Sequence, residues 1–237
     1  MNNGGAAFLL VPVGARAAAL GQASGADAGT SEAAFWNPAG LSTMTSSELA
    51  LHHTHTFASD NYAVAFYLAT RRLGALGVAA YLVDYGAQDV VPGPDQPTVG
   101  SIDPRNVELI ASYAAPIGGG LSFGVNYKIV QFRQDCTGAC GQFESLVGTT
   151  HAVDVGVQYA LAGDALRLGA TVRHAGFPLQ VENRDQADPL PTQVVFGAIY
   201  RMFLPGPSDV DRMDARVLLD LRDDWGQYGD PDVHLGL

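Results

Sequence analysis

Apolar and polar residues alternate along most of this chain after residue 46. In residues 121–130 a large apolar side chain occupies every second position, and residues 152–161 and 166–173 repeat that pattern. Successive side chains of a β-strand point to opposite faces, whereas those of a helix return to one face after three or four residues. Alternation over this length therefore predicts β-strands for the region that carries it.

The alternating runs are long for strands. Ten can be distinguished, most of about ten residues and bounded by Gly, Pro, Asn or Asp. Strands of globular proteins average about five or six residues, but a tilted strand needs about nine to eleven to cross the hydrocarbon layer of a membrane. The run length therefore favours membrane-crossing strands. The runs are 47–57, 61–70, 73–84, 106–116, 121–130, 152–161, 166–173, 192–203, 214–222 and an incomplete one that begins near Asp232.

The low charge content points the same way. Charged residues make up 16% of the chain and apolar residues 47%, whereas a soluble protein has about 25% charged residues. No stretch of about 18 apolar residues occurs, so a transmembrane helix is excluded. A transmembrane β-barrel combines these properties, because half of each strand faces lipid. A soluble β-sandwich with a large core is the alternative that composition leaves open.

The residues between the apolar positions indicate which face meets lipid. They are mostly Gly, Ala, Ser, Asn and Gln, without the many Lys and Glu of a sheet that faces water. A soluble barrel would direct its apolar face inward, but small and polar side chains suit a narrow, partly hydrated lumen. We therefore predict an apolar outer face. The side chains predicted to face the lumen are Asn126, Lys128, Asp154, Gln158, Arg167 and Arg173.

Short and long links between the runs largely alternate, as in outer-membrane barrels. The long links are residues 85–105, 133–149 and 174–191, which we expect to be external loops. The second contains the two cysteines of the chain, Cys136 and Cys140. A disulfide between them would fit an oxidising compartment, provided that the loop turns, and a pair of free thiols is the alternative.

Residues 1–46 have a different character. Ala, Gly and Ser dominate, and alternation is absent. Asn37 is a good N-cap and Pro38 a favoured first helical residue, so a short helix or turn should begin there. Ser31 could cap another turn in the same way. Because Phe35 and Trp36 require burial, we predict that residues 1–46 form a plug inside a barrel of residues 47–237; a disordered tail is the alternative.

Two motifs of this segment carry a family resemblance. Residues 14–21 read Gly-Ala-Arg-Ala-Ala-Ala-Leu-Gly and residues 35–41 read Phe-Trp-Asn-Pro-Ala-Gly-Leu. They resemble the N-terminal plug of FadL-like outer-membrane barrels, most closely the PorV/PorQ branch. The resemblance continues through Gly124-x3-Lys128, Asp154-x-Gly156 and Leu190-Pro191. It departs at Arg173-His174-Ala175-Gly176, where the family has Asn before the apolar-Gly pair.

The resemblance implies an all-β fold, an antiparallel transmembrane β-barrel of the FadL type in the bacterial outer membrane. FadL-like barrels have fourteen strands, so we expect a fragment with about ten of them that lacks the C-terminal strands. The residues implied in the plug are Arg16, Phe35, Trp36, Asn37, Pro38 and Ala39.

The implied function is that of a PorV/PorQ-type component of type IX protein secretion, which engages exported proteins or the translocon. The alternative is a FadL-like channel for the uptake of hydrophobic small molecules. A structural barrel without a transport role is a third interpretation. Outer-membrane lipid is an expected partner in each case.

Other functional classes find little support. The net charge of −11 disfavours nucleic-acid binding. His52, His53 and His55 provide two metal ligands at best, because adjacent residues of a strand point to opposite faces, so no metal site is expected. No catalytic motif is present, and we expect neither an enzyme nor a cofactor.

Overall fold

The computed structural model describes residues 5–70, 73–141, 145–161, 163, 165–181, 187–205, 212–225, 229 and 231–237. Among them, no helix is both long and apolar enough to span a membrane.

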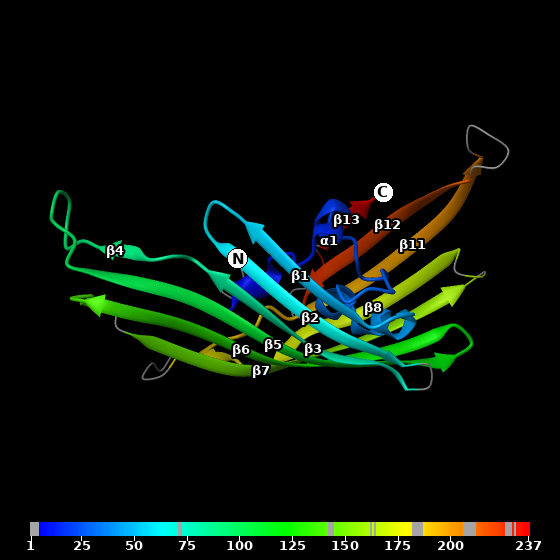
Figure 1. The fold of residues 1–237 in the computed structure, drawn as a ribbon, viewed down its shortest axis with the longest axis horizontal. Coiled ribbons are helices and arrows are strands. Elements are labelled where there is room, and N and C mark those ends of the chain that lie inside the picture. Colours follow the sequence, from blue (N-terminus) through cyan, green and yellow to red (C-terminus); the bar gives the residue numbers. More distant parts are fainter. Residues whose placement is uncertain are drawn as a thin grey trace.

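A large antiparallel sheet forms most of the molecule (Figure 1). Ten of its strands follow one another in chain order, each paired with its neighbour, and β1 and β13 are its two edges. These ten strands correspond to the ten alternating runs of the sequence. They are β1 (Glu48–His55), β2 (Asp60–Thr70), β3 (Gly74–Asp84), β5 (Gly100–Gly118), β6 (Leu121–Gly138), β7 (Leu146–Leu161), β8 (Leu166–Gly176), β11 (Gln193–Pro205), β12 (Arg212–Asp224) and β13 (Asp232–Gly236).

Three strands extend much further than their alternation predicts. Strand β5 has 19 residues, β6 has 18 and β7 has 16, more than a hydrocarbon layer of about 30 Å requires. They project together at the left of Figure 1. The expectation that residues 85–105 and 133–149 are loops is therefore wrong in part. The hydrogen bonds of a β-ladder join backbone groups and do not require alternating side chains, so the ladder continues where the alternation ends.

Short strands occupy parts of residues 85–105 and 174–191, so the expectation that residues 174–191 are a loop is also wrong in part. Strand β4 (Gln88–Val90) pairs with β5, and β9 (Leu179–Gln180) pairs with β10 (Ala187–Asp188) in a separate small sheet.

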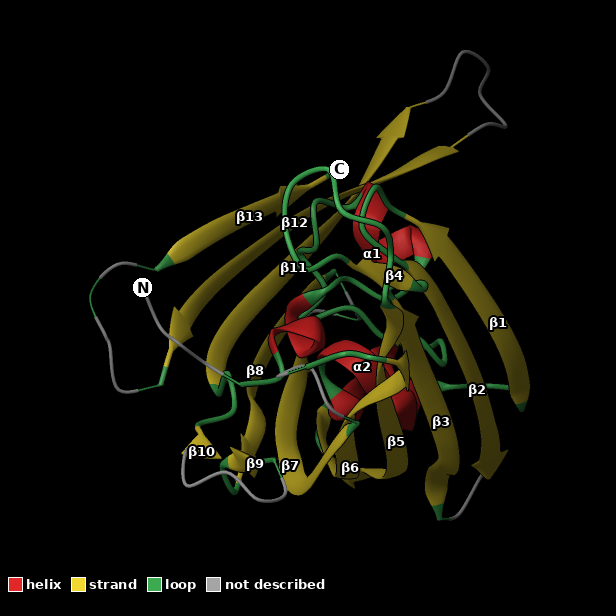
Figure 2. Ribbon diagram, turned by 90° about the vertical axis from the view of Figure 1, so that its left-hand side faces the viewer, coloured by secondary structure: helices red, strands yellow, loops and turns green. Residues whose placement is uncertain are grey.

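The N-terminal residues 5–46, called here the N-terminal segment, lie on the concave side of the curved sheet (Figure 2). They form η1 (Ala7–Leu10), α1 (Ala15–Ala19), α2 (Ala33–Trp36) and η2 (Pro38–Thr43). The predicted cap is confirmed, because the side chain of Asn37 accepts a hydrogen bond from the backbone N–H of Ala39. The prediction for Ser31 is wrong. Its hydroxyl donates to Oε1 of Glu48 in β1 at 2.6 Å, and no side chain caps α2.

The two faces of the sheet differ as the alternation predicts. On β6, Tyr127 points outward and is 50% exposed, whereas its neighbour Lys128 is 1% exposed on the inner face. Aromatic and branched aliphatic side chains of β2, β3, β5 and β7 are likewise exposed on the outer face. Buried apolar residues of the N-terminal segment, among them Phe8, Phe35 and Leu41, pack against the inner face instead. The sheet therefore presents its apolar face outward.

Candidate functional site

A buried charge cluster lies on the inner face of the sheet. Lys128 of β6 places its Nζ 2.9 Å from Oε1 of Glu108 on β5 and 2.8 Å from Oδ2 of Asp154 on β7. All three side chains are almost completely buried. A buried charge is tolerated when it is paired and hydrogen-bonded, as each of these three is. We refer to Glu108, Lys128 and Asp154 as the charge cluster.

Asn126 links the charge cluster to the N-terminal segment. Its amide donates to Oδ2 of Asp154 and to the carbonyl oxygen of Ala34, both at 2.7 Å. Its own oxygen accepts a hydrogen bond of 2.6 Å from Ser112, whose hydroxyl also lies 2.9 Å from that of Tyr67. The side chain of Asn126 is buried, and its NH2 group and its oxygen all have hydrogen-bond partners. Its position is therefore fixed by both the sheet and the N-terminal segment.

A β-bulge in β8 completes this region. The pairing of β7 with β8 shifts between Val153 and Val155, and His174 has a positive φ of 56°. The backbone N–H of His174 donates to Oδ1 of Asp154 at 2.7 Å, and its Nδ1 lies 3.2 Å from Nζ of Lys128. His adopts positive φ more readily than most residues, so His174 suits the bulge.

Trp36 lies next to two arginines of the sheet. The guanidinium carbons of Arg173 on β8 and Arg222 on β12 lie 5.0 and 5.4 Å from the centre of its ring. Both distances are within the range of a cation–π interaction. The indole N–H donates to the carbonyl oxygen of Val13 at 3.1 Å, and Arg222 also donates to the carbonyl oxygen of Gln22 at 3.0 Å.

Glycines of the sheet allow the backbone of the N-terminal segment to approach closely. Gly124 and Gly156 pair with each other on β6 and β7, and Gly169 and Gly197 pair on β8 and β11. A Cβ at any of the four would clash with the N-terminal segment. The clashing groups are Pro38 and Ala39 at Gly124, the side chain of Asn37 at Gly156, and Gly25 and Ala26 at Gly169 and Gly197.

Asn37 secures this close approach. Its amide donates to the carbonyl oxygen of Gly25 at 2.7 Å and to that of Val157 at 3.3 Å. The N–H of the same Gly25 donates to the carboxylate of Asp220 on β12 at 2.8 Å. Pro38 and Ala39 are buried directly after Asn37. Asn37, Pro38 and Ala39 are thus the part of the N-terminal segment that contacts Gly124 and Gly156 of the sheet.

The remaining residues singled out from the sequence lie further from the charge cluster. Gln158 donates to the carbonyl oxygen of Asp27 at 2.9 Å and accepts a 3.4 Å hydrogen bond from Arg167. Arg16 is partly exposed and forms an ion pair with Asp27 at 2.6 Å. Among the residues predicted to face the lumen, Asn126, Lys128, Asp154 and Arg173 therefore share one region with Trp36, whereas Gln158 and Arg167 form a second region.

Sequence reasoning missed Glu108, Asp220 and Arg222. A signal was present, because each is a charged residue at an alternate position of an apolar run. Their partners could not be deduced from that signal. Glu108 meets Lys128 through the register of two neighbouring strands, and Asp220 and Arg222 bind Gly25 and Gln22 of the N-terminal segment.

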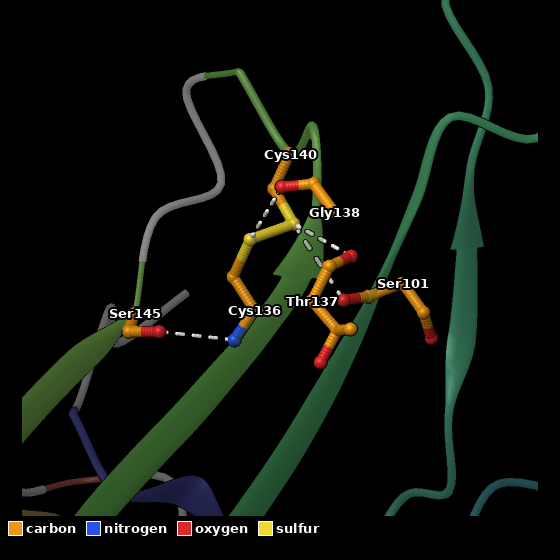
Figure 3. Close-up of a disulfide and its surroundings, with 6 residues drawn as sticks. All are labelled: Ser101, Cys136, Thr137, Gly138, Cys140 and Ser145. Carbon is orange, nitrogen blue, oxygen red and sulfur yellow. Dashed lines mark hydrogen bonds between the residues drawn. A yellow bond between two sulfur atoms is a disulfide. The ribbon is translucent and has the colours of Figure 1, made fainter.

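Cys136 and Cys140 form a disulfide at the outer end of β6 (Figure 3). The backbone N–H of Cys136 donates to the hydroxyl of Ser145 at 3.0 Å. In the same strand, the guanidinium of Arg133 binds both carboxylate oxygens of Asp135. This hydrogen bonding lowers the pKa of Asp135 from its ordinary value. These groups lie beyond the run of β6 that was predicted to cross the membrane.

The histidines of β1 separate as their positions predict. His53 and His55 both contact the carboxylate of Asp60, at 3.4 and 2.8 Å, whereas His52 lies 3.9 Å from Glu32 on the other face. Within the described ranges, no group of three His, Cys, Asp or Glu side chains is arranged to hold a metal ion.

The chain matches one protein family and is similar in structure to a solved protein. The model of a family described as "Uncharacterised protein family (UPF0164)" matches residues 4–188. No curated protein matches the chain. The crystal structure of the Pseudomonas putida toluene transporter TodX is similar, with a TM-score of 0.55 and 12% identity over 87% of this chain and 68% of that one. At this identity the similarity shows the fold, which is an antiparallel all-β fold of the FadL type.

Proposed function

The chain belongs to the uncharacterised protein family UPF0164, and on that premise we propose that it is an outer-membrane barrel protein that controls the passage of hydrophobic small molecules. In this proposal the N-terminal segment plugs the lumen, and the inner face of the sheet holds it in place. The location in the bacterial outer membrane is part of the proposal.

The outward apolar face supports the location. Aromatic and aliphatic side chains cover the outer surface of neighbouring strands, whereas polar and ionised side chains lie on the inner face. A soluble protein rarely exposes a continuous apolar surface of this kind, but a sheet in contact with lipid requires one.

The single observation that carries the proposal is the attachment of the N-terminal segment to the inner face. Asn126, Asp220 and Gln158 each bind a backbone group of that segment directly, through side chains that are buried. In a closed barrel, a segment held at several points against the inner face would obstruct the lumen. Its release or rearrangement would then open a route along the inner face.

Hydrophobic small molecules are the favoured cargo because the similar solved structure is that of a toluene transporter. The test is uptake of a labelled aromatic hydrocarbon, supplied at low concentration, by cells with and without the gene. We expect the deletion to slow uptake and the intact chain to restore it, with uptake of a small sugar unchanged as the control. Equal hydrocarbon uptake in both strains would contradict the proposal.

A PorV/PorQ-type role in type IX protein secretion is the second candidate. The sequences of residues 14–21 and 35–41 favour it, because they resemble the PorV/PorQ branch more closely than FadL itself. In this case deletion should cause exported proteins with a C-terminal secretion signal to accumulate in the periplasm. Normal secretion of these proteins in the deletion strain would exclude this candidate. Neighbouring type IX genes in the genome would favour it.

A further inference from the structure

Two buried arginines lie over one aromatic ring. Arg173 and Arg222 are 6% and 8% exposed, and both lie within cation–π distance of Trp36. In the part of the chain that the structure describes, Nε of each arginine has no hydrogen-bond partner. A buried guanidinium needs compensation for the water it has lost, and the face of an aromatic ring provides part of it. The ring of Trp36 is therefore an essential partner of both arginines.

The arginines belong to the sheet and the ring does not. Arg173 and Arg222 are on β8 and β12, which flank β11, and they lie in register with Gln193 and Val195 of that strand. Trp36 is instead the last residue of the four-residue helix α2 in the N-terminal segment. The sheet thus contributes two cations, and the N-terminal segment contributes the indole ring that lies next to both.

The charge balance of the region selects against a charged occupant. Among the described residues of the surrounding strands, six Asp, Glu, Lys and Arg side chains are buried, three acidic and three basic. An additional anion or cation would lack a partner among them, and burying an unpaired charge is costly. The occupant best suited to this region is therefore an uncharged ring with an electron-rich face. The six side chains are Glu108, Asp154, Asp220, Lys128, Arg173 and Arg222.

A ring cannot bind beside Trp36 without displacing it. The cavity next to Trp36 has a volume of about 10 Å³, and Leu9, Val13 and Phe35 contribute to its apolar side. That volume holds about one water molecule. An aromatic molecule that reaches the arginines must therefore take the position of the indole.

We propose that Trp36 occupies a binding site for an uncharged aromatic molecule, formed by Arg173 and Arg222, and that such a molecule competes with Trp36 for it. This inference rests on the proposed function, because it names the substrate class and the residues that select it. The indole acts as an internal occupant of the site while the plug is in place.

The chain has two tryptophans, so one substitution makes Trp36 its sole indole. Trp225 is 58% exposed, and Trp225→Phe should leave the fold intact. With the purified Trp225→Phe protein we expect ethylbenzene to shift the emission of Trp36 to the red in a saturable manner, because the indole becomes hydrated. Ethylcyclohexane has the same carbon skeleton without the ring electrons, and it should produce no shift. No response to ethylbenzene, or equal responses to both compounds, would overturn the proposal.

Substitution of one arginine tests the contact itself. In the Trp225→Phe background, Arg222→Met should reduce the preference for ethylbenzene over ethylcyclohexane on the order of 3- to 30-fold, because Arg222 contacts Trp36 as well as the bound ring and only the preference isolates its contact with the ring electrons. Arg216→Met is a matched control on the same strand, because Arg216 lies near Asp214 rather than near Trp36. Its affinity for ethylbenzene should equal that of the parent. An equal change in ethylbenzene binding in Arg222→Met and Arg216→Met would overturn the proposal.

The binding and uptake measurements separate the two proposals. Gene-dependent uptake of aromatic molecules without a fluorescence response would overturn the site and leave the proposed transport function intact. A specific fluorescence response in a protein that does not change uptake would support the site and contradict transport.

Discussion

The side chain of Asn37 occupies the space that a Cβ at Gly156 would need. Asn37 belongs to the motif at the start of η2, and Gly156 lies in the middle of β7, 119 positions further along the chain. In the sequence they belong to two separate motifs, Asn37-Pro38-Ala39 and Asp154-x-Gly156. In the folded protein they form one contact, in which a polar side chain of the N-terminal segment lies directly against the backbone of the sheet.

Gly156→Val should therefore displace Asn37. The added side chain has no room, and overpacking of this kind costs about 1–3 kcal/mol. Urea unfolding of the purified protein in detergent should show a lower midpoint. Gly93→Ala is the control, since a Cβ there meets only ordinary van der Waals contacts, and its midpoint should remain unchanged. An unaltered midpoint for Gly156→Val would show that Asn37 does not lie where the structure places it.

Lys128→Met should be strongly destabilising. The substitution leaves the carboxylates of Glu108 and Asp154 buried without their shared cation, and removal of one partner from a buried ion pair costs about 3–5 kcal/mol. The free energy of unfolding checks this value. Adding Glu108→Gln to Lys128→Met removes one of the two carboxylates and should recover part of the loss. A double variant no more stable than the single one would contradict the pairing.

Asn37→Ala should loosen the plug. The variant loses the cap of η2, a change that costs about 0.5–2 kcal/mol in other helices, and it also loses the hydrogen bonds to Gly25 and Val157. We expect increased leakage of small solutes through vesicles that contain the protein. Thr43→Ala is a suitable control, because its hydroxyl bonds only within η2, to Gly40. Permeability of the Asn37→Ala vesicles equal to that of the wild type would argue against a plug.

The ion pair of Arg133 and Asp135 at the end of β6 should weaken at acid pH. Hydrogen bonds from Arg133 lower the pKa of Asp135 below its ordinary value of 3.8. A carboxylate with a lowered pKa in the folded state contributes stability above its unfolded pKa, and this contribution is lost as the pH falls through the folded value. NMR titration of Asp135 should thus give a pKa below that of an exposed aspartate. Arg133→Ala should move it back toward the ordinary value, and an unchanged titration would refute the pairing.

The sequence by itself determined the strands, their faces and one cap. Alternation is a local property, since each residue's face follows from its position in the strand alone, so the ten strands and their outward apolar side chains could be predicted. The cap by Asn37 is equally local, because its acceptor and donor are two residues apart. The predicted ends of β5, β6 and β7 were wrong because a backbone ladder continues without any side-chain pattern.

Only the tertiary structure decided which residues meet. Glu108, Lys128 and Asp154 lie on three strands, and their contact depends on the registers of two antiparallel pairs. The approach of Trp36 to Arg173 and Arg222 further depends on how the N-terminal segment enters the curved sheet. Register and curvature arise from the packing of the whole sheet, because a shift by one residue would turn every side chain to the opposite face. No local stretch of sequence contains that information.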